Sequence, residues 1–256
     1  GTIVNHLFND GKVSDVEIAQ IAQAAENKFF GKPCGLLDQM TSSVGSFVEI
    51  DFADPAKPVI EKVNFDFASC GYALCIVDTG GSHSDLTDEY AAVRKEMESV
   101  AAYLGKSVLR EVDESEFVKN IADIRSSCGD RAVLRAMHFY GDNARVEKQA
   151  AALRAGDFKT FMKYIIESGR SSYMYNQNVY SCKKAAEQPV SLALSLSEKL
   201  LDGCGAWRVH GGGFAGTIQA FVPLNKLDEY KDLMERVFGS GSCYVLSVRP
   251  VGGVEL

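Results

Sequence analysis

A continuous apolar run that ends in glycines is the feature that most constrains how this sequence can fold. Residues 72–78 read Tyr-Ala-Leu-Cys-Ile-Val-Asp and are followed by Thr-Gly-Gly-Ser. Such a run, bounded by a turn signal, predicts a strand buried on both faces, because it presents no polar face along most of its length. A strand of this kind needs other elements to cover it, and the neighbouring sequence must supply them.

The segments after this run have helical spacing. From Leu86 to Leu104, apolar residues recur along one stripe, which predicts an amphipathic helix. The same spacing predicts three further helices, at residues 130–155, 157–168 and 188–201. The last third combines three predicted strands, at 207–210, 217–222 and 244–249, with a helix at 227–238. Strands that flank packed helices indicate an α+β domain, which we place at residues 69–256.

The first 68 residues form a second, smaller predicted unit. Ser14 and Glu17 have capping-box spacing ahead of an apolar periodicity, so residues 14–29 predict a helix. Residues 47–52 and 58–65 predict two strands of a hairpin. The first eight residues have no initiator Met and the pattern of a helix interior, so we expect the chain to begin partway through a protein.

Composition excludes several classes of function. With 46% hydrophobic and 24% charged residues among 256, the chain is typical of a globular protein that can bury a sizeable core. The net charge of -7 is spread along the chain without a basic stripe, which argues against nucleic acid as a partner. No apolar run is long enough for a membrane, and the four scattered histidines predict no metal site. Seven cysteines without a Cys-x-x-Cys pair favour free thiols and a cytoplasmic location.

A turn over residues 31–35 precedes the most informative acidic residue, Asp38. Pro33 fixes one backbone torsion and Gly35 permits close approach, so the turn can present Asp38 at the end of an element. The residue pattern alone favours a helix cap for Asp38, in a helix that starts at Gln39. The alternative is an acid that acts on a ligand.

The glycines Gly211, Gly212, Gly213 and Gly216 formally satisfy the dinucleotide-binding pattern G-x-G-x-x-G. That pattern must open a helix, whereas residues 217–222 are rich in β-branched and aromatic residues and are bounded by Pro223. A nucleotide-dependent oxidoreductase is therefore disfavoured. The residues by themselves predict a glycine-rich hairpin turn.

Three motifs together resemble the galactokinases, which are GHMP small-molecule kinases. Residues 33–39 are similar to the family signature Pro-Cys-Gly-Ile-Met-Asp-Gln, and residues 211–216 resemble its third motif. The segment from His83 and Ser84 to Arg94 resembles the one that supplies a sugar-contacting tyrosine. The resemblance implies a GHMP-kinase-like α+β fold. Residues 1–68 would be the remaining part of the N-terminal domain, and residues 69–256 a complete C-terminal domain, ferredoxin-like with extra helices.

The resemblance also implies transfer of the ATP γ-phosphoryl group, with Mg2+, to the anomeric hydroxyl of galactose or a related sugar. It makes Asp38 the catalytic base, and it places the Gly35 backbone and the Tyr90 hydroxyl against the sugar. A competing interpretation of Tyr90 is a core residue whose hydroxyl is satisfied locally. The glycines of the third motif would shape the site, and we expect Asp38 at the mouth of the largest cleft of the chain.

In the family, the phosphate-binding loop and most Mg2+ ligands precede the matching region. We therefore expect a missing N-terminal segment, a fragment that is inactive by itself, and uncovered apolar surface that favours self-association. The sequence also departs from the family, since His210 stands before the glycines and the usual Glu-Ser-His segment ends in Gly169. A non-catalytic, sugar-sensing regulatory protein with the same fold is the alternative.

Overall fold

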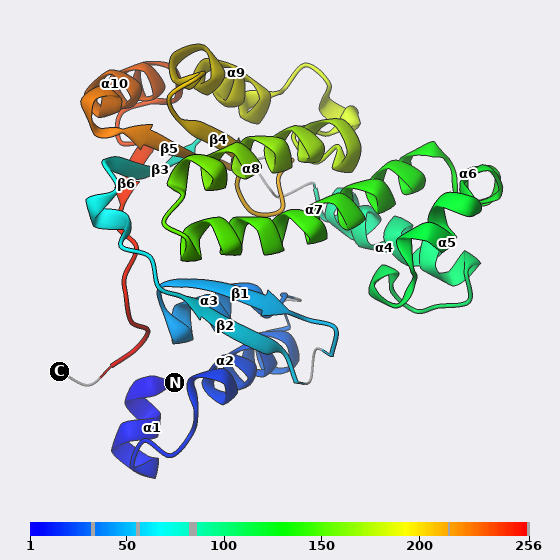
Figure 1. Cartoon of the computed structure of the whole chain (residues 1–256), viewed down its shortest axis with the longest axis horizontal. Helices are drawn as coiled ribbons and strands as arrows, with labels where there is room; N and C mark the ends of the chain where they lie inside the picture. Colours follow the sequence, from blue (N-terminus) through cyan, green and yellow to red (C-terminus); the bar gives the residue numbers. More distant parts are fainter. Residues whose placement is uncertain (32–33, 55–56, 82–85, 215, 255–256) are drawn as a thin grey trace. The chain divides into compact units, whose positions relative to one another are not determined.

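The computed structural model describes residues 1–31, 34–54, 57–81, 86–214 and 216–254 (Figure 1). The chain separates into two compact units, which are described one at a time. Unit 1 comprises Gly1–Phe67, Leu153–Gly156 and Ser247–Leu256, and unit 2 comprises Ala68–Ala152 and Asp157–Leu246. The predicted division at residue 69 places Leu153–Gly156 and Ser247–Leu256 in the second domain, whereas both segments belong to unit 1 here. The assignment of residues 1–68 and 69–256 to the two domains of the family stays a prediction.

Unit 1 combines short helices with a two-stranded hairpin. Its elements are α1 (Thr2–Asn9), α2 (Asp15–Ala24), α3 (Leu37–Val44), β1 (Phe47–Asp51) and β2 (Val59–Val63). The capping box predicted at Ser14 and Glu17 is confirmed at the start of α2, and the helix continues as π-helical turns over Ala25–Phe30. The predicted hairpin is also confirmed, with Phe47 opposite Val63 in an antiparallel pair.

The C-terminal segment of the chain packs on the region between α3 and β1, within unit 1. The Ser46 N–H donates to the Arg249 carbonyl oxygen at 2.7 Å. A Cβ on Gly252 would lie 1.6 Å from the Ser43 carbonyl oxygen, so only glycine allows this approach. The strand predicted to run through Arg249 therefore ends earlier, at Leu246, and the segment from Ser247 onward belongs to unit 1.

Unit 2 is built on an antiparallel sheet with the strand order β4-β5-β3-β6. The strands are β3 (Tyr72–Asp78), β4 (Ala206–Val209), β5 (Thr217–Pro223) and β6 (Cys243–Leu246). The strand predicted at residues 72–78 is confirmed, but the prediction that both of its faces are buried is wrong. Ala73, Cys75 and Val77 are buried, whereas the residues between them are half-buried, because one face of β3 is only partly covered.

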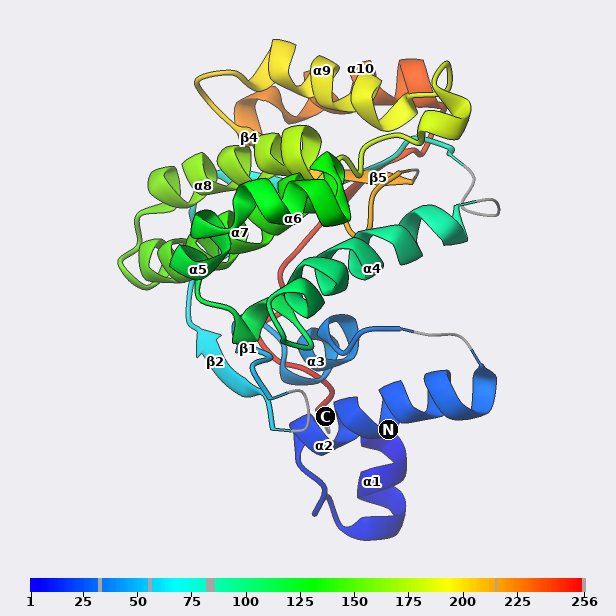
Figure 2. The same cartoon turned by 90° about the vertical axis from the view of Figure 1, so that its right-hand side faces the viewer.

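Helices cover the two faces of this sheet (Figures 1 and 2). The helices of unit 2 are α4 (Thr87–Tyr103), α5 (Glu114–Lys119), α6 (Ile121–Cys128), α7 (Asp130–Arg154), α8 (Phe158–Ser171), α9 (Pro189–Leu201) and α10 (Leu227–Phe238). α9 and α10 bury the apolar face, where Tyr230 and Met234 are fully buried. On the other face, Phe158 of α8 packs its ring against Tyr72 and Phe221.

A second cluster of buried residues joins α4, α5, α6 and α7, with Phe117 and Ile124 fully buried in it. The sequence periodicity does not predict α5 and α6, which are short. No helix in the described ranges has the length and the apolar character that a membrane span requires.

Candidate functional site

Asp38 lies in the first turn of α3 in unit 1, where a negative charge complements the helix dipole. The helix begins at Leu37, and Leu36 is the N-cap residue without a side-chain cap bond. The predicted helix cap by Asp38 is therefore wrong. The Asp38 side chain is exposed and makes no hydrogen bond or ion pair with any residue that the structure describes. Its carboxylate is thus available to a ligand.

Polar side chains hold the turn that precedes α3. The Cys34 N–H donates to Asn27 Oδ1 at 2.7 Å, and Asn27 Nδ2 donates to the Cys34 carbonyl oxygen at 3.2 Å. Gln23 Nε2 donates to the same oxygen at 3.2 Å. Gly35 is exposed, and a Cβ there would meet no atom within 4 Å, so its backbone is open to approach. Pro33 of the predicted turn lies outside the described residues.

Asp38 borders a shallow hollow of about 370 Å³ between α2 and α3, lined also by Ile18 and Ala22. A hollow in unit 2 is larger, at about 610 Å³. The prediction that Asp38 stands at the largest cleft is therefore wrong for the part of the chain that the structure describes. The physical reason is that α2 and α3 pack directly through Ala19 and Met40, which leaves little space between them.

The glycine-rich run connects the antiparallel strands β4 and β5 in unit 2. The predicted hairpin turn is confirmed, because β5 follows the glycines where a dinucleotide-binding motif would need a helix. The His210 N–H donates to the Thr217 carbonyl oxygen at 3.0 Å and closes the base of the loop. Ala215, within the run, lies outside the described residues.

The structure brings Tyr90 of α4 against this loop. Its hydroxyl donates to the Gly213 carbonyl oxygen at 2.7 Å, and its ring meets Phe214 edge-on at 5.3 Å between centroids. A Cβ on Gly212 would lie 2.7 Å from the ring. Burial raises the pKa of the Tyr90 hydroxyl, which therefore stays a donor at neutral pH. Residues 82–85, which include the predicted neighbours His83 and Ser84, lie outside the described residues.

The hollow of about 610 Å³ lies beside the same loop. Leu86 and Phe214 give it apolar walls, and Thr79 and Ser181 contribute polar groups. Thr79 is fixed by Gly216, whose carbonyl oxygen accepts from the Thr79 N–H at 2.9 Å and from its hydroxyl at 2.6 Å. A hollow of this size, with mixed walls, can hold a small molecule.

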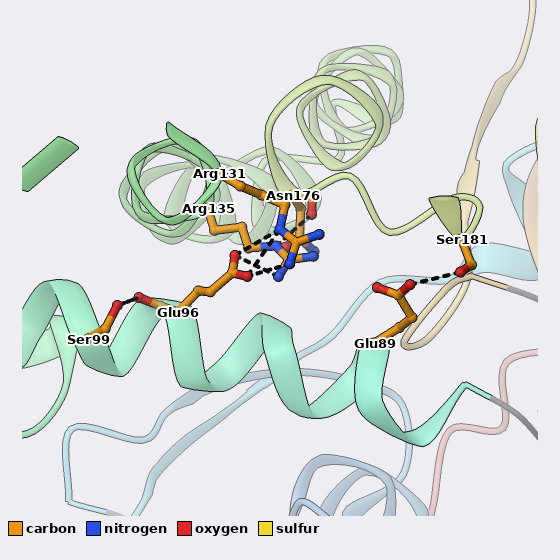
Figure 3. Close-up of polar contacts among 7 residues, drawn as sticks. All are labelled: Glu89, Glu96, Ser99, Arg131, Arg135, Asn176 and Ser181. Carbon is orange, nitrogen blue, oxygen red and sulfur yellow. Dashed lines mark hydrogen bonds and ion pairs between the residues drawn. The ribbon is translucent and has the colours of Figure 1, made fainter. Parts of the chain in front are cut away.

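A charged network that the sequence does not predict joins α4, α7 and Asn176 in unit 2 (Figure 3). Arg135 of α7 is completely buried, and its Nη1 donates to Glu96 Oε2 of α4 at 2.8 Å. Its Nε donates to the Asn176 carbonyl oxygen at 3.1 Å. Arg131 pairs with the other oxygen of Glu96 at 2.5 Å. The signal in the sequence is that Arg135 shares the apolar stripe of its helix, although a cation there usually indicates a solvated face.

The described residues include no group of three or more His, Cys, Asp or Glu side chains that could hold a metal ion. Mg2+ in kinases is held by one or two carboxylates together with phosphate oxygens. A Mg2+ ion that is bound mainly through phosphate therefore needs no such group of side chains.

The chain is similar to galactokinases along most of its length. It is 31% identical over 229 residues to the galactokinase of Homo sapiens, with 90% of this chain and 55% of that protein covered. It is 33% identical over 228 residues to the galactokinase of Bos taurus, with 89% and 55% covered. The chain thus spans about half the length of these relatives. No protein-family model matches it. The resemblance to galactokinases predicted from three motifs is confirmed.

Solved structures show the fold. The structure of Lactococcus lactis galactokinase complexed with galactose matches with a TM-score of 0.74 at 22% identity, and it covers 100% of this chain and 64% of that chain. The L. major mevalonate kinase in complex with R-mevalonate matches with a TM-score of 0.56 at 13% identity, over 95% of this chain and 61% of that chain. The predicted α+β fold of GHMP-family kinases is confirmed.

Proposed function

We propose that the protein containing this chain is a galactokinase-like sugar kinase, which transfers the γ-phosphoryl group of ATP to the anomeric hydroxyl of galactose or a closely related sugar. The observation that carries this proposal is the similarity to galactokinases, which extends over 90% of the chain for the human protein. ATP and Mg2+ are the cofactors it requires, with most of their ligands outside this chain. The odd number of cysteines supports a cytoplasmic location.

Asp38 is the proposed catalytic base. Phosphoryl transfer passes through a loose transition state, so the protein mainly positions the acceptor hydroxyl and stabilises charge. Asp38 lies in the first turn of α3, and a carboxylate that is exposed and makes no hydrogen bond or ion pair with the described residues can accept the hydroxyl proton. A positioned general base contributes roughly a hundred- to ten-thousand-fold to the rate.

Gly35 and Tyr90 are the proposed sugar-binding partners of this base. The Gly35 backbone is open on one side, which suits close approach of a sugar ring. Tyr90 would contact the sugar together with the glycine-rich loop, because its hydroxyl donates to the Gly213 carbonyl oxygen of that loop. Gly211, Gly212, Gly213 and Gly216 would shape the wall that faces the reacting groups.

The test is a coupled ATP and galactose kinase assay on the full-length gene product and two variants. Asp38→Asn preserves size but removes the proton acceptor, so we expect kcat to fall roughly a hundred- to ten-thousand-fold. Asp15→Asn is the matched control, since Asp15 is also exposed and also lies in the first turn of a helix of unit 1. It should keep full activity.

Three outcomes separate the alternatives. Near-normal turnover of Asp38→Asn removes Asp38 from the catalytic role. A full-length protein that binds galactose in titration calorimetry but never forms sugar phosphate is a sensor, which would replace the kinase proposal. The 256-residue chain by itself should show no turnover, and a one-to-one micromolar complex with ATP would mean that the phosphate site lies within these residues.

A further inference from the structure

The glycine-rich loop of unit 2 has a backbone conformation that most residues avoid. Phe214 has a φ of 59°, in the left-handed region that is costly for a bulky residue. Gly213 before it has a φ of 80°, and a Cβ there would lie 1.8 Å from the Asn178 carbonyl oxygen. A strained conformation persists only where the surrounding structure holds it. The residues that contact this loop are therefore the ones that hold its backbone in the strained conformation.

Asn178 makes two hydrogen bonds to the loop. Its carbonyl oxygen accepts from the Phe214 N–H at 2.5 Å, and its Nδ2 donates to the Gly212 carbonyl oxygen at 3.1 Å. Asn178 is only 4% exposed, so water competes little for these bonds. The Tyr90 hydroxyl adds a third bond, to Gly213. Every residue from Gly212 to Phe214 is thus bonded to Asn178 or Tyr90.

Contacts on both sides of Asn178 in the chain fix its own position (Figure 3). Two residues earlier, the Asn176 carbonyl oxygen accepts from Arg135 Nε at 3.1 Å, and Arg135 is ion-paired to α4. Three residues later, the Ser181 hydroxyl donates to Glu89 Oε1 of α4 at 2.8 Å. The segment that carries Asn178 is therefore tied to two long helices. A residue fixed in this way can impose a geometry on the loop instead of following it.

We propose that Asn178 is a positioning residue that sets the geometry of Gly211–Phe214 for the sugar-kinase reaction. This inference rests on the proposed function, because the loop affects turnover only if it borders the reacting groups. Asn178 needs no contact with substrate for this role. A small displacement of a wall that positions the reactants lowers the rate without preventing binding.

The experiment compares Asn178→Ala with Asn176→Ala in the full-length gene product. Both residues are buried asparagines of one segment, but within the described residues the Asn176 side chain makes no hydrogen bond. In Asn178→Ala we expect amide exchange in residues 211–214 to accelerate and kcat to fall, each by roughly three- to tenfold, the equivalent of one lost hydrogen bond. The KM for galactose should change less than about twofold, and Asn176→Ala should change none of these quantities.

Several results would overturn the inference. One is an Asn178→Ala variant whose loop exchange matches that of the unsubstituted protein, and another is faster exchange with unchanged kcat. Equal losses of kcat in both variants would also overturn it, because general destabilisation would then explain the effect. An unsubstituted protein without kinase activity contradicts the proposed function separately, and loop exchange alone then decides whether Asn178 holds the loop.

Discussion

The two units of this chain bury their apolar residues to very different extents. In unit 2 the sheet and the helices α9 and α10 enclose a continuous core, with Tyr230 and Met234 at 0% exposure. In the described part of unit 1, the buried cluster between α2 and α3 consists of Ala19, Leu36 and Met40. Phe8 of α1 is 82% exposed. Unit 2 thus has the buried core of an ordinary domain, whereas unit 1 presents apolar side chains to solvent.

The proposed site residues differ in the same way. Asp38 of unit 1 is exposed and bonded to no side chain that the structure describes. Tyr90 and the glycine-rich loop of unit 2 are packed and hydrogen-bonded to each other. A group that accepts a proton must be accessible, whereas a wall that orients a substrate must be rigid. The comparison therefore fits the proposed roles, in which Asp38 would accept the proton and the glycine-rich loop would orient the substrate.

The largest stability effect should come from Arg135→Ala in unit 2. Removing the buried guanidinium leaves the Asn176 carbonyl oxygen without its donor and opens a cavity, so we expect the free energy of unfolding to fall by roughly 3 kcal/mol. Urea unfolding followed by fluorescence measures this, because Trp207 is the single tryptophan and is buried in unit 2.

Arg131→Ala is the matched control for that change. Arg131 shares the partner Glu96, but 43% of its side chain is exposed, and exposed ion pairs contribute at most about 1 kcal/mol. If both variants lose the same free energy of unfolding, Arg135 stabilises unit 2 through its charge pairing and not through its burial, which contradicts the prediction.

A smaller effect should appear as a pH dependence of unit 2. Burial lowers the pKa of His138 from its ordinary value of 6.5, and Arg208 and Arg145 lower it further, while Asp142 opposes them. Folding therefore favours the neutral ring, so its contribution to stability is complete above pH 6.5 and is lost as the pH falls below that value. Trp207-monitored unfolding between pH 7.5 and about 5.5 should show this loss.

His138→Gln should reduce that slope, because the variant has no proton to bind in the unfolded chain. His6→Gln, in α1 of unit 1, should leave the slope as it is, because Trp207 reports the unfolding of unit 2. If His138→Gln and the unsubstituted chain lose stability in parallel, groups other than His138 cause the pH dependence of unit 2.

Much of the fold could be predicted because its signals are local. The capping box at Ser14 and Glu17 and the apolar run at residues 72–78 each specify one element within a few residues. The packing of the C-terminal segment on unit 1, through Arg249 and Gly252, depends on contacts about 200 residues apart in the chain, which no local pattern encodes. The burial of one face of β3 likewise depends on which helices cover it.

The candidate site was predictable only in part. The glycine-rich hairpin follows from residue types, and the pairing of Tyr90 with it matches the alternative of a locally satisfied hydroxyl. Asn178 gives no signal in the sequence, and the place of Arg135 on the apolar stripe of its helix is a weak one, because an asparagine and an arginine are ordinary surface residues in most sequences. Their importance arises from burial, which depends on how α4 and α7 pack.

The smallest effect on stability, and the clearest difference between the units, should come from the double change Leu7→Ser with Phe8→Ser on α1. These side chains are 70% and 82% exposed, so replacing them should change the Trp207-monitored stability of unit 2 by less than about 0.5 kcal/mol. Exposed apolar side chains nevertheless favour association, at roughly 25 cal/mol for each Å² that becomes buried. Sedimentation velocity of the 256-residue chain should therefore show less self-association in the double variant, whereas Lys28→Ser, an exposed polar change in the same unit, should leave it unaltered. An unsubstituted chain that stays monomeric at high concentration would mean that the exposed apolar residues of unit 1 do not mediate self-association.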